Sequence, residues 1–261
     1  EAAKEADPDM IITGFSAYPR EFDFKMFAEV AEEVDAMLMA DIAHVSGLVA
    51  ADEHQQPFPH CDIVTTTTHK SIRGARGGMI LSKEEYADKV DKAVFPYSQG
   101  GPLMHQIAAK AVSFREAQRP EFKDYAAQIK KNTEALAQGL KEKDLTLISG
   151  GTDNHLVLVD LRDEAITGKK GEKILEEVGI VSNKNSVPYD PKPPMVTSGI
   201  RLGTPALTTR GMEEAELREI GEMIGDLMKN PEDDELKSEK SERVSELLEN
   251  FELYEGTDVK Y

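Results

Sequence analysis

The residues best suited to carry out chemistry are a lysine and an acid, each of which follows a short run with strand character. Lys70 comes after the run Thr65-Thr66-Thr67-Thr68-His69, and Asp41 comes after the apolar residues 37–40. In open α/β sheets, ligands bind beyond the carboxyl ends of the strands. An amine and a carboxylate at neighbouring strand ends are what an aldehyde cofactor with a pyridine ring requires.

Lys70 must lose its proton for part of a cycle in which it bonds covalently to an aldehyde. Desolvation and neighbouring cations favour that loss, and His69, Arg73 or Arg76 are candidates for the cations. The alternative is an ordinary exposed lysine at the end of an edge strand, since a run of threonines also fits a plain strand.

Asp41 at a strand end is suited to keep a pyridine nitrogen protonated, which makes the ring an electron sink. His44, three residues later, is placed to stack on such a ring or to donate to its phenolic oxygen. Two other interpretations stay open, a metal site built on the Asp-x-x-His pair and a helix N-cap role for Asp41. We expect no metal, because no third ligand is clustered with the pair.

Two further segments carry binding chemistry. Gly100-Gly101-Pro102 precedes an apolar helix, and its free backbone N–H groups suit a phosphate, although the same residues also form ordinary turns. Arg201 lies within a short apolar strand. Its guanidinium fits either a substrate carboxylate in bidentate geometry or a structural ion pair.

Hydrophobic patterning predicts an α/β fold with a mostly parallel sheet. Strands are predicted at residues 10–15, 37–40, 63–68 and 77–81, with helices at 23–34, 103–118 and 120–143. In the helix at 103–118, Ile107, Ala111 and Phe114 are expected to face inward. Strands at 145–149, 155–161 and 200–202, with helices at 169–178 and 213–228, predict a smaller α/β domain. A linker at 231–234 and a charged helix at 235–251 are expected to follow.

The domain organisation expected from this pattern has four parts. Residues 1–119 form part of a large domain, 120–143 a linking helix, 144–230 a small domain and 231–261 a helical tail. The first residue is Glu1, and the chain enters at once into an α/β pattern. We therefore expect a fragment that lacks its N-terminal portion.

Composition bounds the function further. Lys and Arg number 31 against 49 Asp and Glu, a net charge of −18, which disfavours nucleic acid and anionic membranes as partners. No apolar run is long enough to span a membrane, and Cys61 is the only cysteine. No charged-then-apolar segment precedes the first predicted strand, so we do not expect secretion. We expect a cytoplasmic protein.

Eight segments together resemble the serine hydroxymethyltransferase family, which uses pyridoxal phosphate (PLP) on the fold-type-I aminotransferase scaffold. They are FSAYPR (15–20), ADIAHVSGLVAA (40–51), VTTTTHK (64–70), RGGMIL (76–81), VFPYSQGGPLMH (94–105), SGGTDNHLVLVDL (149–161), NKNSVPYDP (183–191) and TSGIRLGTPALTTRG (197–211). The match in order and spacing runs from the first strand to about residue 230, and the tail matches only loosely.

The resemblance implies a role for each matching residue. Lys70 is similar to the lysine that holds PLP, Asp41 to the partner of the pyridine nitrogen and His44 to the donor near the ring hydroxyl. The remaining roles are these: Ser16 hydrogen-bonds around the cofactor, Thr67 and His69 flank the lysine, Arg76 lies near the cofactor, Gly100 and Gly101 reach the PLP phosphate of a partner subunit, and Arg201 clamps the amino-acid carboxylate. A homodimer or tetramer with shared sites is implied.

Asn185 and Pro193-Pro194-Met195 occupy positions that the family associates with its pterin. Pro193-Pro194-Met195 departs from the commoner Ser-Pro-Phe, so the resemblance leaves tetrahydrofolate and tetrahydromethanopterin both open. The family's stacking histidine, a phosphate-binding serine, and the glutamate and tyrosines that handle the hydroxymethyl group have no match here. The resemblance therefore implies a chain that is incomplete as a catalyst.

Two rival functions remain. A threonine aldolase or a glycine acyltransferase of the same fold type would share Lys70 and Asp41 but would not need the segments at 149–155 or 183–188. A non-catalytic protein, either PLP-binding or purely structural, would need none of the chemistry.

Overall fold

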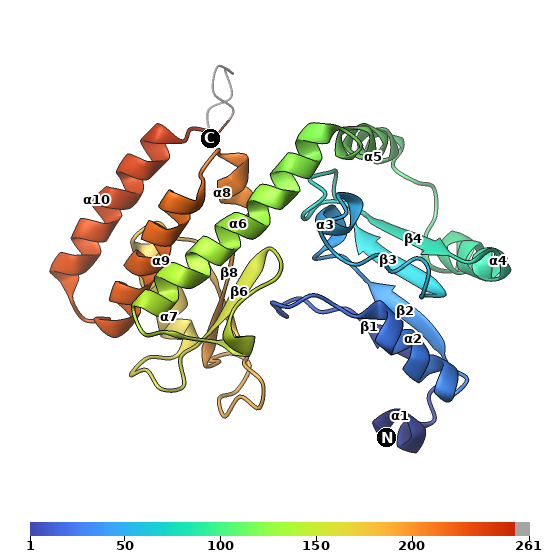
Figure 1. The fold of residues 1–261 in the computed structure, drawn as a ribbon. Helices are drawn as coiled ribbons and strands as arrows, with labels where there is room; N and C mark the ends of the chain where they lie inside the picture. Colours follow the sequence, from blue (N-terminus) through green and yellow to red (C-terminus); the bar gives the residue numbers. More distant parts are fainter. Residues whose placement is uncertain (254–261) are drawn as a thin grey trace. The chain divides into compact units, whose positions relative to one another are not determined.

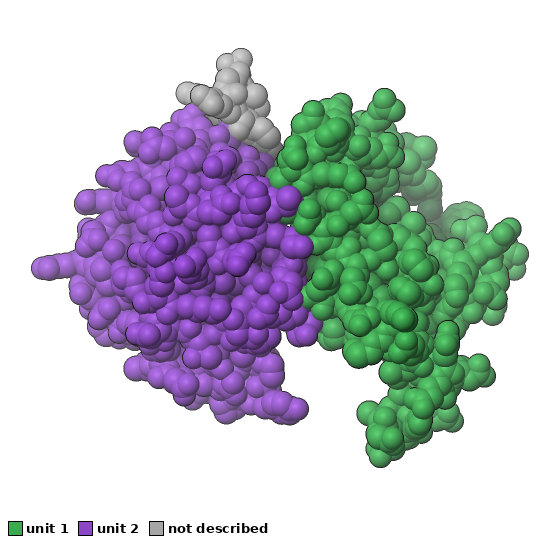
Figure 2. Space-filling model, in the orientation of Figure 1, with its two compact units in different colours: residues 1–16, 21–126 green, residues 17–20, 127–261 purple. Residues whose placement is uncertain are grey.

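The computed structural model describes residues 1–253, which divide into two compact units (Figure 2). Unit 1 contains residues 1–16 and 21–126, and unit 2 contains residues 17–20 and those from 127 onward. The boundary at residue 126 falls inside helix α6 (Pro120–Glu142), so one continuous helix belongs to both units. The four-part division expected from the sequence stays a prediction.

Unit 1 is built on a four-stranded sheet in the order β1-β2-β3-β4 (Figure 1). The strands are β1 (Met10–Thr13), β2 (Met37–Asp41), β3 (Ile63–Thr67) and β4 (Gly78–Ser82). The first three are parallel, and β4 is antiparallel to β3. The predicted α/β fold with a mostly parallel sheet is confirmed for this unit. Because β3 lies between β2 and β4, the interpretation of Lys70 as the end of an edge strand is wrong.

The core of unit 1 follows from the period of its strands. Alternate residues of β2 and β3, among them Leu38, Ala40 and Val64, are buried in one cluster with Phe24 and Ala31 of α2 (Phe24–Glu33). Asp23 caps α2, since its carboxylate accepts the N–H of Met26 at 2.9 Å. Burial of a large apolar side chain contributes about 1.5–3 kcal/mol to the stability of the fold. This buried layer therefore holds the ends of β2 and β3 in place.

Helix α5 (Met104–Ala117) differs from its prediction. Ile107 is 45% exposed, Ala111 is exposed and Phe114 is half-buried, whereas Ser113 and Ala117 are buried. Apolar side chains occur all around this helix, so its periodicity does not define one buried face. Four other segments of unit 1 were not expected from the sequence: α1 (Ala2–Ala6), α3 (Ser46–Ala50), α4 (Glu84–Lys92) and a π-helical segment (Ala93–Ser98). In unit 2, β7 (Asn183–Asn185) and α8 (Pro205–Thr209) were not expected either.

Unit 2 is built on a second four-stranded sheet, in the order β5-β6-β8-β7, and its strand pairs are antiparallel. The strands are β5 (Thr146–Leu147), β6 (Leu156–Asp160), β7 (Asn183–Asn185) and β8 (Gly199–Gly203). All five residues of β6 are buried. The strand expected at 145–149 is cut short, because Ser149 adopts a φ of 58° and a 3-10 turn (Ile148–Gly150) begins.

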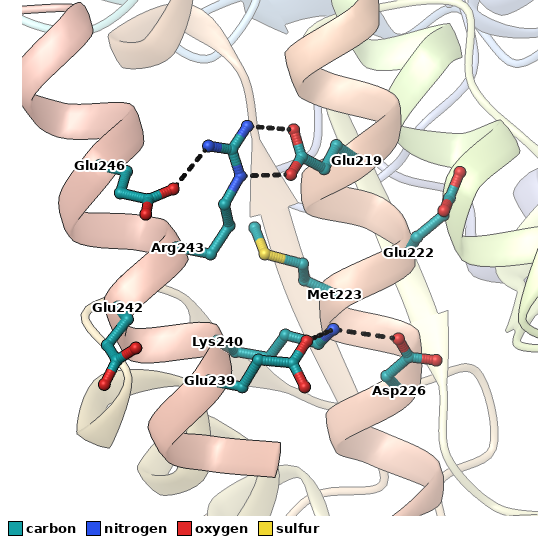
Figure 3. A pocket seen from close by; sticks show the side chains of 9 residues that line it. All are labelled: Glu219, Glu222, Met223, Asp226, Glu239, Lys240, Glu242, Arg243 and Glu246. Carbon is teal, nitrogen blue, oxygen red and sulfur yellow. Dashed lines mark hydrogen bonds and ion pairs between the residues drawn. The ribbon is translucent and has the colours of Figure 1, made fainter.

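Helices α6, α7 (Gly168–Glu177) and α9 (Glu214–Lys229) contribute to the core of unit 2, and α8 (Pro205–Thr209) follows β8. The charged helix predicted at 235–251 is α10 (Asp234–Asn250). It lies on α9, where Arg243 meets Glu219 at 2.6 and 3.0 Å beside a charged hollow (Figure 3). Residues 254–261 of the predicted tail lie outside the described residues.

Candidate functional site

The acid and the lysine loop lie on neighbouring strands of unit 1. Asp41 is the last residue of β2, opposite Thr65 of β3, and the N–H of Ile42 donates to the Thr65 carbonyl at 2.9 Å. The Asp41 carboxylate is exposed and accepts the N–H of Ala43 at 3.0 Å. The N-cap interpretation of Asp41 is wrong, because the next helix, α3, is capped at Val45.

Lys70 is half-buried in the Lys70 loop, residues 68–77, which joins the antiparallel strands β3 and β4. Thr68 is fully buried and closes the base of this loop. Its N–H donates to the Gly77 carbonyl at 3.0 Å, its carbonyl accepts the N–H of Gly74 at 2.7 Å, and its hydroxyl donates to the Ala75 carbonyl at 2.5 Å. The loop is therefore a compact structure that starts from a rigid strand end.

Ser71 ties the Lys70 loop to the segment after Asp41. Its hydroxyl donates to the His44 carbonyl at 3.0 Å and accepts the N–H of Gly47 at 2.9 Å. The Thr67 hydroxyl donates to the Ala43 carbonyl at 3.5 Å. These bonds hold the segments that carry Asp41, His44 and Lys70 side by side, as the strand-end argument predicted. Ser71 was not predicted as a site residue, because a serine after a lysine carries no spacing signal of its own.

His69 is held against the far end of the Lys70 loop. Its Nδ1 accepts the N–H of Gly77, with 3.3 Å between the two nitrogens. That His69, Arg73 or Arg76 supplies positive charge to Lys70 stays a prediction. Arg76 is exposed near the end of the loop, and the guanidinium of Arg73 stacks on an aromatic ring of α6.

The end of β1 approaches Asp41 through a glycine. Gly14 has a φ of 127°, and a Cβ built on it would lie 2.0 Å from the Asp41 carbonyl oxygen. Only glycine allows this contact. The close approach brings the segment with Ser16, which is exposed two residues later, toward the end of β2. Gly14 is a second site residue that the sequence analysis did not single out, although a glycine directly after an apolar run is a usable signal.

Gly100 and Gly101 are exposed and precede α5. No described atom lies within 4 Å of a Cβ built on either glycine. Their backbone groups are therefore accessible, as a phosphate-binding loop requires.

Arg201 lies at the centre of β8 in unit 2 and is half-buried. The Arg201 Nη2 donates to Asn183 Oδ1 at 3.1 Å. In the strand register, Arg201 pairs with Leu158 of β6. Burial lowers the pKa of the Arg201 guanidinium below its ordinary value. A guanidinium that is already partly desolvated and still accessible is suited to a planar anion.

Asp190 organises the loop that carries Pro193, Pro194 and Met195. Its carboxylate accepts the N–H groups of Val187, Lys192 and Ser198 and the Ser198 hydroxyl, at 2.7 to 3.1 Å. Burial would raise the pKa of Asp190, but these hydrogen bonds lower it to about 2.

The side chains on this loop and at its start are accessible. Pro193, Pro194 and Met195 are exposed, and Asn185 at the end of β7 is half-buried. The Asn185 amide donates to the Ser186 carbonyl at 2.8 Å. Across residues 1–253, no group of three or more His, Cys, Asp or Glu side chains is arranged to hold a metal ion, so the metal interpretation of Asp41 and His44 gains no support.

A mostly parallel sheet with a lysine loop beside an acid at a strand end fits the fold-type-I class of PLP-dependent transferases. The family model of serine hydroxymethyltransferase matches residues 1–224. The chain is 55% identical over 257 residues to the "Serine hydroxymethyltransferase" of Prochlorococcus marinus (strain AS9601), an alignment that covers 98% of this chain and 61% of that relative. The chain belongs to the serine hydroxymethyltransferase family, and it spans about three-fifths of the length of this curated relative.

Proposed function

We propose that this chain acts in a serine hydroxymethyltransferase, which interconverts serine and glycine and passes the one-carbon unit to a reduced pterin. The observation that carries the proposal is the attachment of the Lys70 loop to the segment after Asp41 through Ser71. Family membership supports the reaction.

The residues at the strand ends fit PLP. An amine (Lys70), a carboxylate (Asp41) and a hydroxyl (Thr67) lie on adjoining segments. Two buried hydroxyls, on Thr13 at the end of β1 and Ser46 in α3, have no hydrogen-bond partner among the described residues. Buried polar groups normally have a partner, so these hydroxyls are expected to bond to groups that complete the site. When bound, PLP supplies an electron sink for the bond that breaks at the amino-acid Cα.

The chain's own residues have distinct tasks in this proposal. Lys70 attaches the cofactor, and Asp41 keeps a proton on the pyridine nitrogen. His44 lies near the ring hydroxyl, and Ser16 and Arg76 contribute polar contacts around the cofactor. Thr67 and His69, which both precede the lysine, orient the start of the Lys70 loop.

Substrate and pterin contacts are assigned to unit 2. Arg201 binds the carboxylate of serine or glycine in bidentate geometry, supported by its half-buried position on β8. Asn185 and the Pro193-Pro194-Met195 segment contact the pterin, and the Asp190 hydrogen bonds that fix this loop support the assignment. Tetrahydrofolate and tetrahydromethanopterin both remain candidates for the pterin.

A second copy of the chain is the proposed partner, in a dimer or tetramer located in the cytoplasm. Six exposed apolar side chains lie on or next to α5 and the Gly100-Gly101 loop in the sequence, and we call this set the α5 surface. They are Phe95, Tyr97, Leu103, Met104, Ile107 and Val112. Exposed apolar groups that lie together mark interaction sites. Their position around the glycine loop supports the proposal that Gly100 and Gly101 reach the PLP phosphate of the other subunit.

The test is conversion of serine to glycine in the presence of PLP and each pterin in turn. Because the chain spans about three-fifths of its relative, turnover is measured with the remaining part of that relative supplied on the same polypeptide. Glycine formed only when a pterin is present supports the proposal. Aldol cleavage of threonine without any requirement for a pterin would support the threonine aldolase instead.

A further inference from the structure

The Lys70 loop has one more attachment, to helix α6, which the proposed function does not use. The guanidinium carbon of Arg73 lies 3.9 Å from the ring centroid of Tyr125 and 5.6 Å from that of Phe122. A guanidinium within about 6 Å of an aromatic face is attracted by the negative face of the ring. Arg73, Phe122 and Tyr125 all belong to unit 1.

Arg73 closes the turn that contains Lys70. Its N–H donates to the Lys70 carbonyl at 2.9 Å, and its φ of 58° lies in the left-handed region that arginine rarely adopts. Gly74 follows, and a Cβ built on it would lie 2.5 Å from Ser113 Oγ and 2.6 Å from the Thr68 carbonyl oxygen. A turn with this strain persists only where its surroundings hold it, so the Arg73 side chain is an anchor for the turn.

The aromatic platform, defined as Phe122 and Tyr125, is itself fixed. Phe122 is 4% exposed, and the two ring centroids are 5.8 Å apart. Lys123, on the same helical turn, pairs with Asp52 at 2.9 Å. Asp52 also accepts the Gln56 side-chain amide at 3.1 Å. The burial of Phe122 and the Lys123–Asp52 pair therefore support the position of the platform in unit 1.

We propose that the aromatic platform positions the Lys70 amine by holding Arg73. The inference rests on the proposed function, because that amine is the group assigned to PLP. Arg73, Phe122 and Tyr125 are positioning residues, since they act on Lys70 through the turn. Removal of either side of the contact loosens the turn and lowers the fraction of time that the amine spends in the orientation required for attachment.

The experiment compares Tyr125→Leu and Arg73→Ala with the wild-type chain by two measurements. The first is amide hydrogen exchange of residues 69–76. The second is the rate at which added PLP becomes borohydride-trapped on Lys70. We expect about two- to fivefold faster exchange, the size set by an exposed cation–π contact, and a similar loss in trapping rate. The double variant is expected to add little to either single variant, because both remove one contact.

Tyr125→Phe is the matched control, because it keeps the ring face and is expected to give the wild-type exchange rate and the wild-type trapping rate. Urea unfolding separates a local effect from general destabilisation. Unchanged exchange of residues 69–76 in Tyr125→Leu, or equal trapping rates in Tyr125→Leu and wild type, would overturn the inference. Trapping is measured with the remaining part of the relative supplied on the same polypeptide, as for turnover. If the wild-type sequence then traps no PLP on Lys70, the proposed function fails, and amide exchange of residues 69–76 still tests whether the platform holds the turn.

Discussion

At the scale of single residues, the chain uses small polar groups to place the larger ones. Ser71 is one residue from Lys70, and its hydroxyl joins the Lys70 loop to His44 and Gly47. The Asp190 carboxylate serves the proposed pterin loop in the same way, through four accepted hydrogen bonds. The groups assigned to ligands, Asp41 and Met195, are left exposed. Rigid support beneath accessible groups is what preorganised binding requires.

Arg201→Ala is expected to weaken serine binding by about 2–5 kcal/mol, because it removes a partly desolvated charge from the substrate carboxylate. Arg201→Lys keeps the charge but loses the planar fork, so its loss is expected to be intermediate. Calorimetric titration with serine measures both. Arg218→Ala removes an arginine that pairs with Glu142 at 2.7 Å and serves as the control. Equal serine affinity in Arg201→Ala and wild type would remove Arg201 from the substrate site.

Asp190 is expected to make the free energy of unfolding depend on pH in the acid range. Its pKa in the folded chain is about 2, lowered from 3.8, so its contribution is present above about pH 4 and is lost as the pH falls toward 2. Asp190→Asn is expected to lower the free energy of unfolding by about 1–2 kcal/mol at pH 7, after allowance for solvent screening. The difference is expected to stay constant down to pH 4 and to shrink at pH 3.

Urea unfolding of wild type and Asp190→Asn at pH 7, 4 and 3 gives this difference directly. Asp163→Asn changes an exposed carboxylate near the end of β6 and is the control, with little effect expected at any of these pH values. A gap between wild type and Asp190→Asn that is as large at pH 3 as at pH 7 would contradict the assignment.

At the scale of elements, the strand ends converge because backbones approach closely. Gly14 at the end of β1 meets the Asp41 carbonyl, and Gly47 in α3 meets Ser71, where a Cβ would lie 2.4 Å from the carbonyl oxygen. Both glycines lie where one element touches the next. The Gly100-Gly101 loop is different, because its glycines are open to solvent and not packed.

Gly14→Ala is therefore expected to destabilise unit 1 by about 1–3 kcal/mol through overpacking, with the positive φ adding strain, and to reduce PLP attachment at Lys70. Gly100→Ala is the matched control, because no described atom lies within 4 Å of the new Cβ, and it is expected to leave unfolding unchanged. Urea unfolding tests both variants, and borohydride trapping tests Gly14→Ala. If Gly14→Ala unfolds at the wild-type urea concentration, the close approach of β1 to Asp41 is not a structural requirement.

Sequence patterns predicted well those elements whose apolar residues recur with a clear strand or helix pattern. These are β6 and the helices α2, α6 and α9, whose observed bounds lie within one or two residues of the predicted ones. The antiparallel order of the second sheet has no local signal, since it depends on pairing between residues far apart. The stacking of Arg73 on Tyr125 and the burial of α5 escaped prediction for the same reason.

At the scale of the whole molecule, the net charge and the exposed apolar side chains have opposite effects on the association of copies. The net charge of −18 keeps copies apart, whereas the α5 surface favours association. No described helix combines the length and the apolar character needed to cross a bilayer. A second copy is the occupant that we propose for the α5 surface, and salt that screens the acidic charge is expected to strengthen the association.

The double variant Ile107→Glu, Val112→Glu is expected to shift the chain to monomer, because it places two charges on the α5 surface. Sedimentation velocity over a range of concentrations measures the assembly. Val181→Glu is the control, since Val181 is 90% exposed in unit 2 and lies away from the α5 surface in sequence. A sedimentation coefficient that the double variant leaves unchanged would show that copies associate through another surface, or that they do not associate.

The most direct test of the central claim is borohydride trapping of PLP on the chain, followed by peptide mass analysis. We expect one dominant adduct on the peptide that contains Lys70, lost in Lys70→Ala and retained in Asp41→Asn, which is expected to keep the cofactor but lose turnover. Labelling spread over surface lysines, and equal in wild type and Lys70→Ala, would contradict the account.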